Sequence, residues 1–427
     1  MKINDRVTVK YIKQDKLKTG GISVFFCDSL TKERAYKNTL IQSVLSRGTE
    51  NLKTAKAITE RLQELYGSDI ATNVDKRGEI QVVSFAADFV EEKFAPGMNL
   101  IRETTELIFD VIFNPLTENG VFCKSYFDRE KENLNDYILS LKNEKRSYAR
   151  MRLLQNMCEN EAYGIFESGN ISDGENLTNE ELYDYYKNYF LKKMNVYIYI
   201  CSKEEPTEIL EYIKNYPPLK NFGERTEVKT GYVENRDIPY ENVKHIAEPA
   251  EVSQAQLQIG FRANANPGND EYYATAVMDY ILGGSSESKL FLNVREKNSL
   301  AYYAASSYIR LKGLLIIYCG IAPDKYDDAL DICLLQLKAI RDGDFTDEEL
   351  QNAKANIARG VRSIDDTVFG KMNFSFNCDI RNEIYDDDVK SIEEYASKFD
   401  NVTREDVIEA AKRVCLDTVY LLGGSNE

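Results

Sequence analysis

A polar stripe runs along one face of the helix that the sequence predicts over residues 35–46. Thr39, Gln42, Ser43 and Ser46 recur at i, i+3, i+4 and i+7, so their side chains share one helix face. Histidines at two positions four residues apart would lie on one such face and could ligate the same zinc ion. Hydroxyl and amide groups are poor zinc ligands. Taken alone, the stripe is therefore more typical of an ordinary polar helix face than of a metal site.

The other candidates for metal ligands are one histidine and eight cysteines. His245 is the only histidine in 427 residues, and its place in a predicted linker favours a surface residue over a ligand. The cysteines lie at positions 27, 123, 158, 201, 319, 333, 378 and 415, and no two of them form C-x-x-C. Scattered cysteines in a long chain without an export signal are expected to be reduced and buried. We expect neither a bound metal nor a cofactor.

Charge and hydropathy exclude several classes of partner. The chain has 54 basic and 70 acidic residues and a net charge of −16, whereas nucleic-acid binding needs a basic surface. No segment approaches 18 uninterrupted apolar residues, so no membrane span is predicted. The N-terminal segment MKINDRVTVKYIKQDK lacks the apolar run of a signal peptide. We expect a cytoplasmic protein that binds neither nucleic acid nor membrane.

The elements that must position the polar stripe occur twice along the chain. The first set comprises strand 21–30, helix 35–46, a helix from Thr54 to Gly67, a hairpin of strands 69–75 and 80–89, helix 97–113, a long charged helix over about 120–145, a helix capped by Thr178 and Glu181, and the strand MNVYIYICS. The second set begins at the strand AQLQIGFRA and ends with a helix capped by Thr403 and Asp406 and the strand TVYLLGG. Corresponding turns at Gly78 and Gly313 lie 235 residues apart, and corresponding caps at Thr178 and Thr403 lie 225 apart.

The repetition predicts an α+β fold of two homologous repeats, each an antiparallel or mixed β-sheet covered by helices on one side. We expect an N-terminal domain over 1–215 and a C-terminal domain over 251–427. A polar stretch punctuated by prolines, 216–250, would link them.

This organisation resembles the M16 peptidases, the inverted zincins that include insulysin-like and mitochondrial-processing-type enzymes. The resemblance spans essentially the whole chain. Its most specific carriers are SVLSRGTENLKTAKAITERLQELYGS, NPL at 114–116 leading into REKENLNDYI, and LGGSSESKLFLNVREKNSLAYYAASSY.

An active M16 peptidase carries H-x-x-E-H on the first helix, and a further glutamate on the long helix completes its zinc site. Counted back from Arg47-Gly48-Thr49, the five matching positions are residues 39–43. Both histidine positions and the base are replaced, by Thr39, Ser43 and Gln42. The third ligand aligns with Tyr137, next to Asp136. The resemblance therefore implies a protease fold with a degenerate zinc site, which cannot cleave peptides on its own.

In this family the second domain of the partner subunit supplies an arginine and a tyrosine to substrate held at the zinc. Arg295 in NVREK and Tyr302 in LAYY match that motif. Residues Gly283, Gly284, Ser285 and Ser286 fall where mitochondrial-type non-catalytic subunits have a glycine-rich substrate loop, although this loop is shorter and poorer in glycine. A phosphate-binding loop is not indicated, because G-x-x-x-x-G-K-[ST] is absent.

The resemblance leaves three hypotheses for function. The first is a non-catalytic subunit that completes the substrate chamber of a zinc-bearing M16 paralogue for a peptide or unfolded protein segment, as a heterodimer, with a homodimer when the chain is alone. The overall pattern is most similar to the inactive-subunit branch of bacteria associated with modification of elongation factor P. The second is a purely structural scaffold without a proteolytic role. The third, an enzyme with a carboxylate-bound metal, is permitted by the acidic composition but supported by no spacing.

Overall fold

The computed structural model describes residues 2–220 and 237–423. The chain divides into two compact units that do not follow chain order. Unit 1 comprises Met1–Leu139, Ile165–Lys229 and Ile364–Asn377, and unit 2 comprises Ser140–Gly164, Thr230–Ser363 and Cys378–Glu427.

The sheet of unit 1 is five-stranded, with the order β1-β7-β2-β4-β3. Its strands are β1 (Val7–Lys13), β2 (Thr19–Ser29), β3 (Ile70–Arg77), β4 (Ile80–Val90) and β7 (Asn195–Ser202). β1 runs parallel to β7, and the other neighbours are antiparallel. β3 and β4 form a hairpin around Gly78, whose φ of +58° is the left-handed conformation that glycine adopts readily.

The helices of unit 1 cover one face of this sheet with a continuous apolar core. They are α1 (Lys32–Leu45), α2 (Ala55–Glu64), α3 (Leu100–Phe113), α4 (Lys124–Ser140), α6 (Ile171–Gly174), α7 (Asn179–Tyr185), η4 (Tyr186–Phe190), α8 (Leu191–Lys193), α9 (Thr207–Asn215) and α10 (Pro217–Lys220), with the turn η1 (Glu92–Phe94) and the short ribbon β5 (Thr117–Glu118) and β6 (Val121–Phe122). At the centre of the core, Phe26 of β2 stacks on Phe190 at 4.5 Å and meets Phe85 edge-on at 6.2 Å.

The sheet of unit 2 repeats this topology, with the order β10-β11-β9-β12-β8. Its strands are β8 (Lys244–Glu248), β9 (Ala255–Arg262), β10 (Ala301–Ile309), β11 (Leu314–Ile321) and β12 (Cys415–Leu422). β12 pairs in parallel with β8, as β7 does with β1. The helical elements are η2 (Leu141–Asn143), α5 (Lys145–Met157), η3 (Ala162–Gly164), η5 (Tyr240–Asn242), α11 (Glu271–Gly283), η6 (Phe291–Lys297), η7 (Pro323–Lys325), α12 (Tyr326–Arg341), α13 (Asp347–Arg362), α15 (Ile392–Asp400) and α16 (Arg404–Arg413); η8 (Ser363–Asp366) and α14 (Val368–Tyr385) pass from unit 2 into unit 1 and back.

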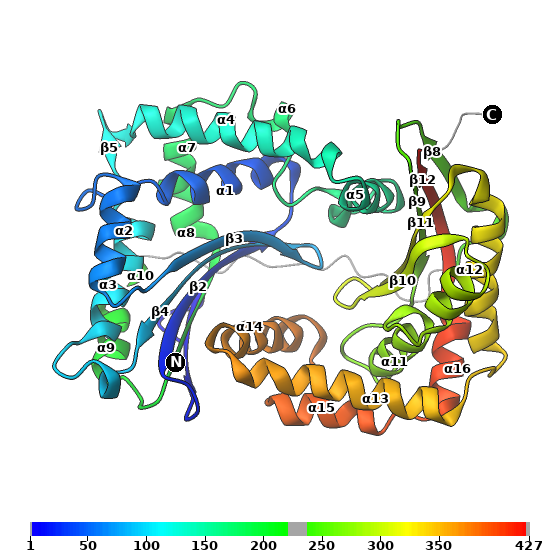
Figure 1. The fold of residues 1–427 in the computed structure, drawn as a ribbon. Helices are drawn as coiled ribbons and strands as arrows, with labels where there is room; N and C mark the ends of the chain where they lie inside the picture. Colours follow the sequence, from blue (N-terminus) through cyan, green and yellow to red (C-terminus); the bar gives the residue numbers. More distant parts are fainter. Residues whose placement is uncertain (1, 221–236, 424–427) are drawn as a thin grey trace. The chain divides into compact units, whose positions relative to one another are not determined.

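Each sheet also carries, on its other face, a helix from the opposite half of the sequence (Figure 1). In unit 1, Phe376 of α14 stacks on Phe25 of β2 at 4.2 Å. Phe25 and Phe26 are adjacent in one strand, so their side chains lie on opposite faces of the sheet. In unit 2, α5 packs on β9 and β12, and its Leu153 and Met157 cover Gly260. Burial on both faces explains why β2, β7 and β9 are buried along almost their whole length.

The predicted α+β fold of two homologous repeats is confirmed by the matching sheet topologies. The capping boxes at Thr178 and Thr403 are also confirmed. The expected single helix over 120–145 is wrong: α4 ends at Ser140, and the backbone at Glu144 is non-helical with φ −87° and ψ 77°, where the chain passes into unit 2. The expected domains 1–215 and 251–427 are contiguous, whereas the units exchange segments 140–164 and 364–377. Of the expected linker 216–250, residues 221–236 lie outside the described part, and Lys244–Glu248 form β8.

Candidate functional site

The polar stripe predicted on the first helix lies on α1, where its hydroxyl groups bond to the helix itself. Thr39 Oγ1 donates to the Ala35 carbonyl at 3.0 Å, and Ser43 Oγ donates to the Thr39 carbonyl at 3.2 Å. Such bonds to the carbonyl four residues back are a common way for hydroxyls to be satisfied within a helix. Gln42 differs, because its amide Nε2 reaches across to Thr72 Oγ1 on β3.

One pocket of about 250 Å³ in unit 1 brings all four predicted positions together. It is lined by Thr39, Gln42, Ser43 and Tyr137, together with Thr72, Asn73, Val74, Glu130, Asn133, Leu134 and Ser168. α1, α4 and β3 contribute most of these side chains. Helix α4 thus places Tyr137 beside the stripe, where the alignment with the third zinc ligand expects it.

Glu130 is a pocket residue that the sequence prediction missed. It lies seven residues before Tyr137 on α4, two turns away on the same face, so helical spacing could have found it. Its side chain is 6% exposed, and its Oε1 lies 2.7 Å from Arg47 Nε and accepts a 3.0 Å bond from Asn133 Nδ2. The Glu130 carboxylate therefore already forms an ion pair with Arg47 and accepts a hydrogen bond from Asn133. Burial, followed by the charge of Glu167, raises the pKa of Tyr137, which keeps its phenol protonated at neutral pH.

The pocket does not fit zinc. Its potential donors are four aliphatic hydroxyls, amides, a protonated phenol and one carboxylate that is already ion-paired, whereas zinc prefers thiolate, imidazole and carboxylate. Within residues 2–220 and 237–423, no cluster of three or more His, Cys, Asp or Glu could hold a metal ion. We therefore derive no metal-dependent step from this pocket.

Arg295 and Tyr302 both lie in unit 2 and are open to solvent. Arg295 lies in the last turn of the π-helical segment η6, where its guanidinium covers the Phe291 ring at 4.7 Å and its Nε lies 3.5 Å from Glu296 Oε1. Its side chain is 44% exposed. Tyr302, the second residue of β10, is 67% exposed.

Tyr302 is the extra residue of a β-bulge. Ala301 pairs with Ile321 and Tyr303 pairs with Gly320, so two steps along β10 oppose one step along β11. A bulge of this kind redirects a side chain relative to the regular pleat, and bulges are frequent beside functional sites. The backbone thus turns the Tyr302 phenol outward.

The predicted glycine-rich loop has a packing explanation for its first residue. Gly283 ends α11, and a Cβ there would lie 2.2 Å from the backbone nitrogen of Ser306 on β10. Only glycine permits this close approach of helix to strand. Gly284 caps the helix, and Ser285 Oγ accepts a 3.2 Å bond from the Glu287 amide, while Ser286 is exposed. The loop therefore adjoins β10, the strand that carries Tyr302.

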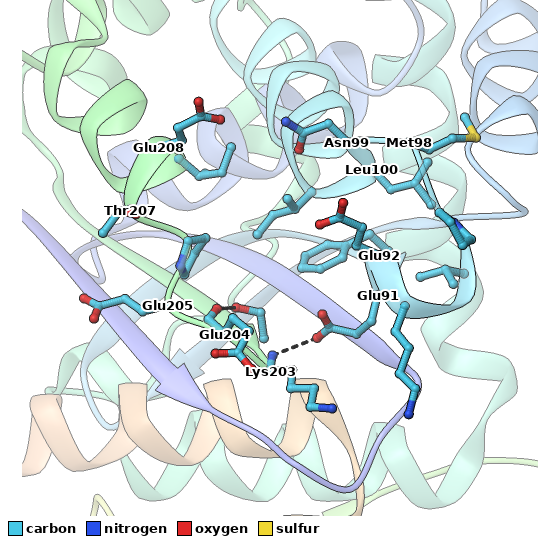
Figure 2. A pocket seen from close by; sticks show the side chains of 18 of the residues that line it. Glu91, Glu92, Met98, Asn99, Leu100, Lys203, Glu204, Glu205, Thr207 and Glu208 are labelled. Atoms are coloured by element: carbon cyan, nitrogen blue, oxygen red, sulfur yellow. Dashed lines mark hydrogen bonds between the residues drawn. The ribbon is translucent and has the colours of Figure 1, made fainter.

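A larger cavity of about 840 Å³ opens between the starts of α3 and α9 (Figure 2). Five glutamates, at 91, 92, 204, 205 and 208, lie among its lining residues, and Glu91 accepts a 2.9 Å bond from the Lys203 amide. None of the predicted site residues lines this cavity.

The remaining candidate ligands are scattered. His245 is exposed on β8, with Nδ1 3.5 Å from the Tyr326 hydroxyl. All eight cysteines are free thiols, and all but Cys415 are buried, as the sequence predicts. No helix in the described part of the chain combines the length and the apolar character needed to cross a bilayer.

Comparison with known proteins places this geometry in a family context. The family model described as "Peptidase M16 inactive domain" matches residues 176–357. The chain is 32% identical over 423 residues to "Probable inactive metalloprotease YmfF" of Bacillus subtilis, covering 98% of this chain and 96% of that protein. It is 26% identical over 41% of its length to "Uncharacterized zinc protease YmxG" of the same organism, covering 42% of that protein.

Solved structures agree on the fold. A conserved protein from Enterococcus faecalis superposes with a TM-score of 0.90 at 26% identity, covering 100% of this chain and 98% of that one. A peptidase M16 inactive domain from Pseudomonas fluorescens superposes with a TM-score of 0.77 at 15% identity, covering 100% and 98%.

Proposed function

The chain belongs to the M16 peptidase family as an inactive member, and from that premise we propose that it is the non-catalytic subunit of a two-subunit zinc peptidase. Its role would be to complete the substrate chamber of a zinc-bearing M16 relative. The observation that carries the proposal is the pocket of unit 1, which gathers Thr39, Gln42, Ser43 and Tyr137 in one place without a donor set for zinc. Under this proposal the pocket derives from a zinc site that has lost its ligands.

The proposal assigns a positive role to Arg295 and Tyr302, which would act in trans on substrate held at the partner's zinc. A guanidinium and a phenol can each donate a hydrogen bond to a carbonyl oxygen that gains negative charge during peptide hydrolysis. Their exposure, and the bulge that turns Tyr302 outward, support this role. The loop at Gly283 to Ser286 would border the same substrate.

The partner is proposed by class. The chain would join this partner as a cytoplasmic heterodimer and form a homodimer when alone. The occurrence in Bacillus subtilis of both an inactive relative, YmfF, and a zinc-protease relative, YmxG, supports the existence of such a pair. The substrate would be a peptide or an unfolded protein segment. We also propose that the complex takes part in modification of elongation factor P, and identification of the substrate would test this role.

The decisive experiment mixes the purified chain with that zinc-bearing relative. We expect a stable complex by light scattering and peptide cleavage that requires both chains. Arg295→Ala and Tyr302→Phe should each lower turnover roughly a hundredfold, the usual cost of losing one transition-state donor. Ser43→Ala is the matched control and should leave turnover unchanged, because its hydroxyl bonds only to the Thr39 carbonyl within α1 and the proposal gives it no role in the reaction.

Two results would overturn the proposal in different ways. Normal assembly with full turnover in the Arg295 and Tyr302 variants would make this chain a scaffold. Chelator-sensitive cleavage by this chain alone would make it an enzyme.

A further inference from the structure

The bulge at Tyr302 is held by contacts that no sequence motif indicates. The ring of Tyr303, the next residue of β10, lies over Gly320, where an added Cβ would come within 2.5 Å of Tyr303 Cε1. The Tyr303 hydroxyl donates a hydrogen bond to Gln256 Oε1 on β9. These contacts fix the residue that follows the bulge.

The exposed side chain of Arg146 packs over the Tyr303 ring. Its guanidinium lies 4.6 Å from the centroid of the Tyr303 ring and 4.6 Å from that of Tyr318 on β11. One cation thus bridges an aromatic ring on each of the two strands that form the bulge. Arg146 lies at the start of α5, so a residue from the first half of the sequence braces a strand of the second half.

Gly320 makes the bulge sterically possible. It faces Tyr303 in the ladder directly after the register shift. A side chain there would also meet Gln254 Nε2 at 2.5 Å, so the Tyr303 ring would have to move. Gly320 therefore leaves room for the Tyr303 ring, and the Arg146 guanidinium packs against the same ring.

We propose that Arg146, Tyr303 and Gly320 are positioning residues that hold the β-bulge and so present the Tyr302 hydroxyl to bound peptide; this inference rests on the proposed function of Tyr302. None of the three needs to touch the substrate. Arg146 is the best test position, because it is exposed and its removal leaves the packed core intact.

The first test measures Tyr302 in the chain alone, with 3-fluorotyrosine at position 302 and fluorine NMR. We expect one sharp resonance in the parent chain and a shifted or broadened one in Arg146→Ala. Arg146→Lys, which keeps a cation over the rings, should restore the parent signal. Arg404→Ala is the matched control, since it removes a cation 4.3 Å from the Phe345 ring elsewhere in unit 2 and should not move the resonance.

The second test measures turnover of the mixed complex. Exposed cation–aromatic contacts are weak, so Arg146→Ala should lower kcat by roughly three- to fivefold with KM unchanged. The double variant Arg146→Ala/Tyr302→Phe should be no slower than Tyr302→Phe, because Arg146 acts only through Tyr302.

The outcomes separate the two ideas. If Tyr302→Phe slows turnover but Arg146→Ala changes neither turnover nor the fluorine signal, the positioning inference is wrong and the proposed function stands. If Tyr302→Phe has no effect on turnover, the proposed function fails, and an unchanged fluorine signal in Arg146→Ala would reject the positioning inference separately.

Discussion

Glu161, just beyond α5, ties this exchanged helix to the sheet of unit 2 through two buried cations. Its Oε1 lies 2.7 Å from Arg262 Nη2, and its Oε2 lies 2.7 Å from Lys312 Nζ. The Arg262 and Lys312 side chains are 7% and 1% exposed, and that of Glu161 is 13% exposed. Arg262 also binds Asp417 at 2.7 Å and the Met157 carbonyl at 2.8 Å. We predict that Glu161→Gln, which keeps the shape but removes the charge, destabilises the protein.

The magnitude follows from the electrostatics of the carboxylate. Burial alone would raise the pKa of Glu161, but hydrogen bonds and charge attraction from Arg262 and Lys312 outweigh it and lower the pKa from 4.5 to about 2. A change of this size corresponds to about 3 kcal/mol of folding free energy. Removing one partner of a buried ion pair typically costs about 3–5 kcal/mol, which agrees. We therefore expect Glu161→Gln to lower the free energy of unfolding by about 3 kcal/mol at pH 7.

The pH dependence gives the sharper test. A carboxyl group whose pKa is lowered by folding stabilises the protein fully above its unfolded pKa, and this stabilisation is lost as the pH falls toward the folded pKa. The difference between parent and variant should therefore be constant from pH 7 to about pH 5.5, fall below half by about pH 3 and reach roughly an eighth of its full value near pH 2. Urea unfolding followed by far-ultraviolet circular dichroism measures it. Glu393→Gln, whose partner Arg362 is exposed, is the control and should show no comparable change.

Equal stability of parent and Glu161→Gln at pH 7 would refute this reasoning. A difference that persists unchanged at pH 3 would also refute it, because the loss would then come from packing and not from charge.

Three further predictions concern other parts of the molecule. Phe376→Ala should cost about 3–5 kcal/mol, because this buried ring stacks on the sheet of unit 1, whereas Phe94→Ala, at a ring 46% exposed, should cost about 0.5 kcal/mol or less; thermal unfolding compares them. In the native chain only Cys415 should react quickly with a thiol reagent, because the other seven cysteines are buried, whereas all eight should react in denaturant. Rapid labelling of two or more native thiols would contradict this burial. Restoring the three zinc ligands and the base at the four pocket positions should create a site for about one zinc per chain, detected by elemental analysis after dialysis and compared with the parent chain. Failure to bind would show that these positions do not converge as a zinc site requires. The quadruple variant is Thr39→His, Gln42→Glu, Ser43→His and Tyr137→Glu.

The sequence predicted well those features that local chemistry determines. The helix caps at Thr54, Thr178 and Thr403 and the hairpin at Gly78 depend on residues close in the chain, and the structure has them. β1 and β8 were missed because edge strands are half exposed and their apolar pattern is weak. The exchange of α5 and α14 could not be predicted, because α4 and α5 are nearly continuous in sequence and nothing local indicates which sheet a helix will cover.

The same distinction holds for the candidate site. Thr39, Gln42 and Ser43 could be placed on one helix face from spacing, and Tyr137 was added through the family resemblance. Thr72 and Ser168 come to the pocket from distant segments, and no periodicity connects them to α1. The bulge that directs Tyr302 depends on a missing side chain at Gly320 on the neighbouring strand, which is visible only once the strands are paired.

The exchanged helices have a consequence for how the protein is made. The last strand of the unit 1 sheet, β7, ends at Ser202, but helix α14, which covers the second face of the sheet, begins only at Val368. At about 5–20 residues per second, a ribosome needs roughly ten to thirty seconds to synthesise the chain between them. Throughout that interval Phe25, Tyr197 and Tyr199 lack their aromatic partner Phe376. The nascent first half thus presents an apolar sheet face until synthesis is nearly complete, which makes this interval the period when a chaperone would protect the chain most and a premature stop would expose it to proteolysis.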